Sequence, residues 1–203
     1  MNTPRVSGLV LAGGTSRRMG FDKAAIVVAD EPQVVTVWRL LSEALGEAVV
    51  SVRTREQAAA LPPGPSVVLD GVSDAGPMAG IVAAHRMWPD RALLVVAVDT
   101  LGLEAATVDA LLAARTDELN GGRAEAVALA RDAVDGPEPL CAIWEPSILR
   151  RAAAAFDRGA RRPRALLADV AVRLVPRGAW NITNVNTPAE LAGYLDTAWE
   201  VRS

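Results

Sequence analysis

The chain contains one cysteine, Cys141, and one histidine, His85, among its 203 residues. An intrachain disulfide and a zinc centre of cysteine and histidine ligands are therefore excluded, and a bound metal must be held by oxygen atoms. The net charge of -3 excludes the basic surface that is typical of nucleic-acid-binding proteins. The longest apolar run, residues 92–98, is far shorter than the ~18 residues of a membrane span. Because the amino-terminal residues also lack the pattern of a secretory signal, we expect a cytoplasmic protein without membrane or nucleic-acid partners.

The composition is that of a folded globular chain. Hydrophobic residues make up 51% of the sequence and charged residues 22%, which excludes disorder. On the usual scale of ~150 residues per domain, 203 residues correspond to one domain. We therefore predict a single domain over residues 1–203.

Short β-branched runs alternate with helical stretches through the first 120 residues. Strands are expected at residues 6–11, 48–52, 66–69 and 93–98, and helices at residues 34–45, 57–61, 79–87 and 105–115. Unbroken apolar strands are typical of parallel sheets that are buried on both faces. The repeated βαβ pattern predicts a three-layer α/β/α, Rossmann-like, mostly parallel sheet. Ligands of such sheets bind beyond the carboxyl ends of the strands.

The remaining residues have a less regular pattern. Strands are expected at residues 124–131, 140–144 and 172–175, a loop at residues 135–139, and helices at residues 147–156 and 164–169. Ser147 is the expected cap of the first of these helices. A last helix is expected from Pro188 to about residue 199, with Thr187 as its N-cap.

The first predicted strand runs into a glycine-containing loop, Leu11-Ala12-Gly13-Gly14-Thr15-Ser16-Arg17-Arg18-Met19-Gly20-Phe21-Asp22-Lys23. Its spacing is neither that of a Walker A loop nor Gly-x-Gly-x-x-Gly. Glycines let backbone amides approach an anion, and Arg17, Arg18 and Lys23 add positive charge. A bare Gly-Gly pair would indicate only a tight turn, but the complete string predicts a cradle for a triphosphate.

This loop resembles the nucleotide-binding loop of the molybdenum cofactor guanylyltransferases. Further segments agree in order over nearly the whole chain: Asp70, Gly76-Pro77-Met78-Ala79-Gly80, Val98-Asp99-Thr100, Pro139-Leu140-Cys141-Ala142-Ile143 and Asn184-Val185-Asn186-Thr187-Pro188-Ala189-Glu190-Leu191. Related cytidylyltransferases usually carry Ala-Ala-Gly in the loop and lack the terminal Asn-x-Asn-Thr-Pro, so both motifs favour guanine. The family belongs to the glycosyltransferase-A-like nucleotidyltransferases, so the resemblance implies a fold of the nucleotide-diphospho-sugar transferase type.

The resemblance also implies the reaction. The expected enzyme transfers GMP from Mg-GTP to the phosphate of molybdopterin or the molybdenum cofactor and releases pyrophosphate. GTP is expected on residues 1–120 and molybdopterin on residues 121–203. The implied protein partners are molybdoenzymes or their chaperones, which would receive the product.

Residue roles follow from the resemblance and from the chemistry of each side chain. Lys23, Arg18 and Asp99 are the expected catalytic residues, with Asp99 holding Mg²⁺ through oxygen. The expected nucleotide-binding residues are Leu11, Ala12, Gly13, Gly14, Lys23, Asp70, Gly76, Pro77 and Asp99. Asn184 and Asn186 are expected to bind the acceptor. The competing interpretations are a helix cap for Asp99 and turn formation for Asp70 and the two asparagines.

Three positions depart from the family pattern. Leu101 stands where the family often has proline, and a family asparagine after the second strand is replaced near Val52-Arg53-Thr54. Asp30-Glu31-Pro32-Gln33 replaces a Gly-x-Pro-Leu entry to the first helix. Two alternatives therefore stay open. One is a related nucleotidyltransferase that uses CTP or another phosphorylated acceptor, and the other is a divergent nucleotide-binding protein without catalysis.

Overall fold

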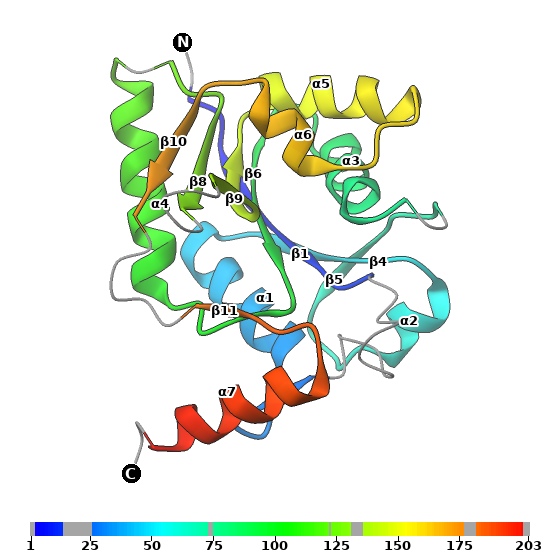
Figure 1. The fold of residues 1–203 in the computed structure, drawn as a ribbon. Coiled ribbons are helices and arrows are strands. Elements are labelled where there is room, and N and C mark those ends of the chain that lie inside the picture. The colour runs from blue at the N-terminus through cyan, green and yellow to red at the C-terminus, as the bar shows by residue number, and fades with distance from the viewer. Residues whose placement is uncertain are drawn as a thin grey trace.

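The computed structural model describes residues 3–13, 26–72, 75–121, 123–130, 136–176 and 182–200. Their main sheet contains β1 (Val6–Leu11), β4 (Ala48–Val52), β5 (Ser66–Leu69), β6 (Ala92–Ala97), β8 (Ala126–Ala130), β9 (Pro137–Trp144) and β10 (Val172–Val175). The order across the sheet is β10-β8-β9-β6-β1-β4-β5 (Figure 1). All neighbours are parallel except β9, which is antiparallel to both β6 and β8. The predicted mostly parallel sheet is confirmed.

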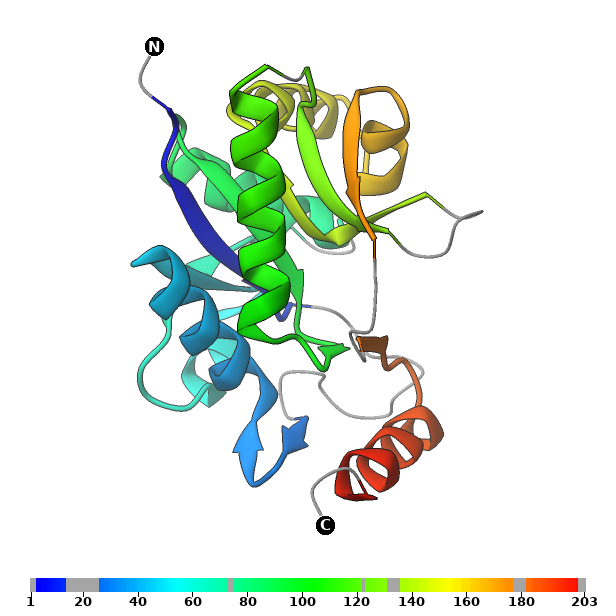
Figure 2. The ribbon, with the colours of Figure 1, turned by 90° about the vertical axis from the view of Figure 1, so that its left-hand side faces the viewer.

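Helices cover both faces of this sheet. On one face lie α1 (Gln33–Leu45) and α4 (Ala105–Leu119), and on the other lie α3 (Pro77–Met87), α5 (Pro146–Asp157) and α6 (Pro163–Ala168) (Figure 1). A short helix, α2 (Arg55–Ala60), joins β4 to β5. The last helix, α7 (Pro188–Glu200), lies apart from both layers, near the ends of the strands (Figure 2). No helix among the described residues combines the length and the apolar character that a bilayer span requires.

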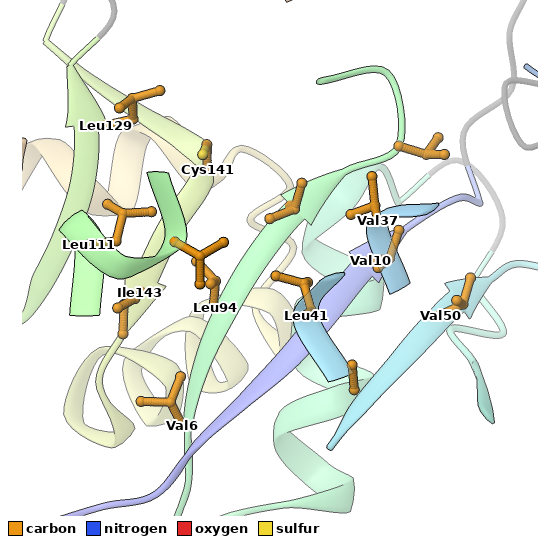
Figure 3. Packing of buried hydrophobic residues seen from close by; sticks show 14 of the residues in the cluster. Val6, Val10, Val37, Leu41, Val50, Leu94, Leu111, Leu129, Cys141 and Ile143 are labelled. Atoms are coloured by element: carbon orange, nitrogen blue, oxygen red, sulfur yellow. The ribbon is translucent and has the colours of Figure 1, made fainter. Parts of the chain in front are cut away.

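The two faces carry separate apolar cores because side chains of a strand alternate between its faces. In β1, Val10 points toward α1, where it packs near Val37 and Leu41 (Figure 3). Leu9 and Leu11 point the other way and belong to the core beneath α3 and α5. Burial on both faces explains why the three consecutive residues Leu9, Val10 and Leu11 are all apolar.

The structure corrects two predictions in the second half of the chain. The loop expected at residues 135–139 is wrong over residues 137–139, because β9 begins at Pro137. The pairing of β8 with β9 is irregular between Ala128 and Ala130, and such a bulge accommodates a proline in a strand. Ser147 does not cap α5, which begins at Pro146 after Glu145.

Two small sheets, which the sequence did not predict, lie outside the main one. β2 (Val27–Val28) and β3 (Glu31–Pro32) form a hairpin whose turn residue Asp30 has φ 66°. Aspartate tolerates this left-handed conformation, which accounts for its replacing the family glycine there.

The second small sheet joins β7 (Thr100–Leu101) to β11 (Thr183–Asn184) in antiparallel pairing, and we call it the clasp. Leu101 is fully buried in a small cluster with Ile26 and Val185. The leucine that departs from the family pattern therefore anchors the carboxyl-terminal segment beside the end of β6.

Candidate active site

Four adjacent strands of the main sheet end at the same edge. β1 leads into Gly13, β4 into Arg53, β5 into Asp70 and β6 toward Asp99. A cavity of about 240 Å³ opens at these strand ends. It is lined by Leu11, Gly13, Ser51, Arg53, Asp70, Val72, Ala75, Gly76, Pro77, Ala97, Val98, Asp99 and Leu140. The cavity thus lies where ligands of parallel α/β sheets bind.

The cavity brings together six of the predicted nucleotide-binding residues, Leu11, Gly13, Asp70, Gly76, Pro77 and Asp99. Ala12 is different, because it is buried in the core and its backbone N–H donates to the Ser51 carbonyl at 2.9 Å. The predicted residues Gly14, Arg18 and Lys23 lie outside the described residues, so their roles stay predictions.

Gly13 sits where a side chain would close the cavity floor. An added Cβ would lie 3.0 Å from the Asp70 Oδ2 atom and 3.1 Å from the Arg53 backbone nitrogen. The missing side chain allows the ends of three strands to approach each other. It also leaves backbone open to a ligand that lies across them.

Asp70 is held at the end of β5 with its carboxylate against the cavity. Its backbone N–H donates to the Val52 carbonyl at 3.0 Å, which fixes the residue beside β4. Its Oδ1 atom is buried and has no hydrogen-bond partner within the described ranges. Burial raises the pKa of Asp70, and the nearby Arg53 charge and hydrogen bonding from the Val72 backbone oppose that shift. An unpartnered acceptor at a cavity is suited to a ligand that donates hydrogen bonds.

The helix α3, predicted over residues 79–87, begins two residues earlier, at Pro77. Gly76 is the N-cap, with φ 63°, a backbone conformation that favours glycine, and Pro77 occupies the first helical turn. Because Gly76 and Pro77 line the cavity, the amino end of α3 faces it. A helix amino end carries partial positive charge and attracts anions.

Asp99 follows β6, is half-buried and lines the cavity. In the sheet, β1 and β4 separate β6 from β5, the strand that leads into Asp70. Its backbone carbonyl accepts the Val185 N–H at 3.0 Å, so the clasp holds this residue in place. The helix-cap alternative for Asp99 is wrong, because Glu104 is the N-cap of α4.

A magnesium ion fits the donor set around Asp99. Within the part of the chain that the structure describes, no group of three or more His, Cys, Asp or Glu side chains encloses a metal. Mg²⁺ does not require such a cage, because it is commonly bound by one or two carboxylates together with substrate phosphates and water. A single aspartate that lines the cavity, as Asp99 does, meets that requirement.

The clasp brings the predicted acceptor residue Asn184 beside Thr100, which follows Asp99 in the chain. The Thr100 hydroxyl donates to Asn184 Oδ1 at 3.2 Å, and Asn184 Nδ2 donates to Glu138 Oε2 at 3.4 Å. The Asn186 backbone N–H donates to Glu190 Oε2 at 2.6 Å, at the start of α7. Neither asparagine is among the described residues that line the cavity. Their acceptor role stays a prediction.

The sequence interpretation missed two polar residues of the cavity, Ser51 and Arg53. Both lie at the carboxyl end of β4, and β4 pairs directly with β1. Ser51 is almost fully buried, and its hydroxyl has no hydrogen-bond partner in the described parts of the chain. The rule that ligands bind at strand ends would have included both residues if the neighbour of β1 had been known.

Comparison with known proteins identifies the family. Residues 8–174 match the family model described as the MobA-like NTP transferase domain. The chain belongs to this family. It is accordingly a nucleotidyltransferase, with the fold and the strand-end site described above.

Relatives in the MobA-like family match most of this chain. The molybdenum cofactor guanylyltransferase of Burkholderia vietnamiensis is 36% identical over 198 residues, which cover 94% of this chain and 95% of that protein. The molybdenum cofactor biosynthesis bifunctional protein of Synechocystis is 32% identical over 187 residues, 90% of this chain. The match spans only 52% of that longer protein.

A solved structure shares the fold. The molybdopterin-guanine dinucleotide biosynthesis protein A from Archaeoglobus fulgidus superposes with a TM-score of 0.74. The alignment covers 96% of this chain and 99% of that protein, at 23% identity. At this level of identity, the similarity shows a shared fold.

Proposed function

We propose that the protein transfers GMP from Mg-GTP to the terminal phosphate of molybdopterin, with or without bound molybdenum. The observation that carries the proposal is one cavity lined by Asp70 after β5, Gly13 after β1 and Asp99 after β6, with β1 lying between β6 and the β4–β5 pair. The names of full-length relatives such as the Burkholderia vietnamiensis protein support the choice of GTP and of molybdopterin.

The size of the site suits an extended nucleotide. β5 and β6 are separated in the sheet by β4 and β1. At ~4.8 Å between neighbouring strands, the axes of β5 and β6 lie ~14 Å apart. A base at the Asp70 side and phosphates at the Asp99 side would occupy this length, with the backbone at Gly13 beneath the nucleotide.

The transfer is a single exchange at phosphorus. An oxygen of the acceptor phosphate forms a bond to the α-phosphorus of GTP, and the bond from that phosphorus to the α,β-bridging oxygen breaks. Pyrophosphate leaves with the bonding electron pair, and a guanine dinucleotide remains. Such a reaction needs alignment and charge stabilisation more than covalent chemistry from the protein.

The residues divide these tasks. Asp99 would hold Mg²⁺, which when bound neutralises negative charge on the phosphates. Lys23 and Arg18 would contribute positive charge in the same region, as the loop motif predicts. The amino end of α3 adds a fixed partial positive charge, and Asp70 orients the base by accepting hydrogen bonds.

The acceptor would lie against residues 121–203, on the side of the clasp. Asn184 and Asn186 offer amide donors and acceptors to a heterocycle edge. The division into a nucleotide half and an acceptor half, the transfer of product to molybdoenzymes or their chaperones, and the cytoplasmic location all stay predictions.

The deciding experiment measures binding before turnover. Calorimetric titration of the purified chain with GTP, CTP and ATP, each with Mg²⁺, needs no unstable pterin. We expect selective binding of GTP. Incubation with GTP, Mg²⁺ and molybdopterin should then release pyrophosphate and yield a guanine dinucleotide, which chromatography separates from GTP.

Each of the two alternative functions predicts a different result in these experiments. A preference for CTP or ATP would indicate a related nucleotidyltransferase with another base. Binding of GTP without release of pyrophosphate in the presence of molybdopterin would indicate a nucleotide-binding protein without this catalysis.

A further inference from the structure

Arg53 is a cavity residue with no role in the proposed reaction so far. It follows β4 directly, is half-buried, and lines the cavity together with Asp70 and Val72. Its backbone N–H donates to Gln57 Oε1 at 3.0 Å, which holds the turn between β4 and α2. The position of Arg53 at the cavity is therefore set by the local structure.

Arg53 and Asp70 lie at the ends of the neighbouring strands β4 and β5, and both residues lie beside Gly13. The Asp70 backbone N–H donates to the carbonyl of Val52, the residue before Arg53, at 3.0 Å. A Cβ on Gly13 would contact both the Asp70 carboxylate and the Arg53 backbone nitrogen. The positive charge of Arg53 lowers the pKa of Asp70, against the effect of burial. The two residues therefore line the cavity from neighbouring strand ends, near enough for the Arg53 charge to act on the Asp70 carboxylate.

Together the two side chains offer opposite hydrogen-bonding chemistry. A guanidinium has five donors and no acceptor, whereas an ionised carboxylate only accepts. Asp70 Oδ1 is buried and lacks a hydrogen-bond partner among the described residues. Guanine has a matching edge, since its O6 and N7 atoms accept while the adjacent N1–H and N2 amine donate.

We infer that Arg53 selects guanine, and this inference rests on the proposed function. The Arg53 guanidinium donates to O6 and N7 of the base, while Asp70 accepts from N1–H and the N2 amine. Adenine and cytosine each carry an amine where guanine carries O6, so either base would present a donor to Arg53. A site built to hydrogen-bond one group rejects an analogue that leaves its polar side chains unpaired. Arg53 is thus a specificity residue that complements Asp70.

Two GTP analogues separate the contacts of the two residues. 7-Deaza-GTP lacks the N7 acceptor, and ITP lacks the N2 amine. In calorimetric titrations with Mg²⁺, the native chain should bind GTP about tenfold more tightly than 7-deaza-GTP. In Arg53→Ala, GTP affinity should fall by about 10- to 100-fold and the preference for GTP over 7-deaza-GTP should disappear. The preference for GTP over ITP, which depends on Asp70, should be kept.

Two further variants serve as controls. Arg55→Ala removes an exposed arginine two residues away, on α2, and should leave all nucleotide affinities unchanged. Arg53→Lys keeps the charge but loses the planar fork of donors, so its discrimination should fall between the native and alanine values. Thermal unfolding checks that each variant is folded. If the alanine variant does not fold, the lysine variant alone tests whether the discrimination between GTP and 7-deaza-GTP depends on Arg53.

The outcomes also separate this inference from the proposed function. A native chain that prefers GTP, together with an Arg53 variant that keeps the native ratio of GTP to 7-deaza-GTP affinity, overturns the inference alone. A native chain that prefers CTP or ATP, or binds no nucleotide, overturns the proposed function and the inference with it.

Discussion

The main sheet has two edges of opposite chemistry. At the amino edge, where the parallel strands begin, charged side chains are paired: Arg115 with Glu145, and Arg91 with Glu47. At the carboxyl edge, where these strands end, Asp70 carries a buried oxygen that has no hydrogen-bond partner within the described ranges. An unpaired buried polar group typically costs ~1–3 kcal/mol. The ion pairs at the amino edge therefore stabilise the fold, whereas the unpaired Asp70 oxygen at the carboxyl edge lowers stability and is available to bind a ligand.

Both ion pairs of the amino edge are extended by a further hydrogen bond. Arg115 is almost fully buried, and its Nε donates to Glu145 Oε1 at 2.5 Å while an Nη2 hydrogen bond reaches the Pro4 carbonyl at 2.8 Å. Arg91 bonds to Glu47 and also donates to the Ser7 hydroxyl at 2.9 Å. These contacts connect β1 and the residues before it to elements that are distant in sequence.

Breaking the amino edge should have the largest effect on stability. Arg115→Ala leaves the Glu145 carboxylate unpaired in a largely buried position, which should cost ~3–5 kcal/mol of unfolding free energy. For a chain of this size we expect the Tm to fall by about 10 °C, with GTP affinity unchanged, in thermal unfolding and calorimetry. Arg151→Ala, which removes an exposed pair with Glu125, should cost ~1 kcal/mol or less. Equal effects of the two variants would contradict the assigned role of the amino edge.

Breaking the carboxyl edge at Asp99 should remove activity without removing the fold. Asp99→Ala should lower kcat by ~10²–10³-fold, because a charge-stabilising group is lost, while the Tm changes little. Asp90→Ala is the matched control, since Asp90 is an exposed aspartate just before the same strand, β6, at the amino edge. It should keep native turnover in the pyrophosphate-release assay. Native turnover in Asp99→Ala would exclude this residue from the mechanism.

Asp70→Asn should separate binding from stability. Because burial raises the pKa of Asp70, the folded state holds this proton more tightly than the unfolded state. The resulting stabilisation is present at low pH and is lost as pH rises above the ordinary value of 3.8 through the raised pKa. At pH ~7 the variant should therefore match or exceed the native Tm, by at most ~3 °C, while GTP affinity falls by about 10- to 100-fold.

The measurement for Asp70 is a pair of melting curves, one near neutral pH and one at pH ~4. The advantage of the variant over the native chain should shrink at the lower pH. A variant that melts well below the native chain at neutral pH would show that this carboxylate is a structural group.

His85 should give the smallest effect, and it tests an unpartnered group that lies away from the carboxyl edge. It is buried near the end of α3, and its Nδ1 atom lacks a hydrogen-bond partner in the described part of the chain. Burial, and then the charges of Arg150 and Arg86, lower its pKa. Stability should therefore fall as pH drops below about 6.5, with a slope of at most ~1.4 kcal/mol per pH unit.

His85→Gln should flatten that acid limb of a Tm-against-pH profile and leave turnover at neutral pH unchanged. The expected reason is that glutamine does not take up a proton in this range. A loss of turnover in His85→Gln would mean that the functional groups are not confined to the carboxyl edge.

Local sequence signals were sufficient for many elements. The bounds of β1, β4, β5 and β10 follow from short apolar or β-branched runs that end at loop residues. Thr187 was predicted as the cap of the last helix, and its hydroxyl accepts the Glu190 N–H at 3.2 Å. Each of these features depends on residues that are close in sequence.

Features that depend on distant residues could not be predicted in the same way. The insertion of β9 between β6 and β8 rests on pairing across about 45 residues of chain, from Val96 to Cys141. The clasp pairs Leu101 with Thr183. The two-residue strands of the clasp have no periodicity, and the position of β9 in the sheet depends on residues that are far apart in the sequence.

In the candidate site too, residues with a local sequence signal were predicted, and a residue placed by distant parts of the chain was not. Asp70 and Asp99 were predicted because each directly follows an apolar strand and fits the family motif. Arg53 was not, since its place in the cavity depends on β4 lying between β1 and β5. The sequence shows that Arg53 departs from the family pattern, but only the arrangement of the strands shows that Arg53 lies beside Asp70.

Because the clasp is small, we expect the carboxyl-terminal segment to detach by local unfolding without unfolding of the main sheet. Two residue pairs and the buried trio Ile26, Leu101 and Val185, with Leu191 and Tyr194 packed against them, attach this segment beside the main sheet. Units with few buried contacts open at lower free energy than core strands do. Backbone amides of α7 should therefore exchange with deuterated solvent well before those of β1 and β6. For an acceptor bound against the clasp, as proposed above, entry and release would then require only this local opening and no change in the main sheet.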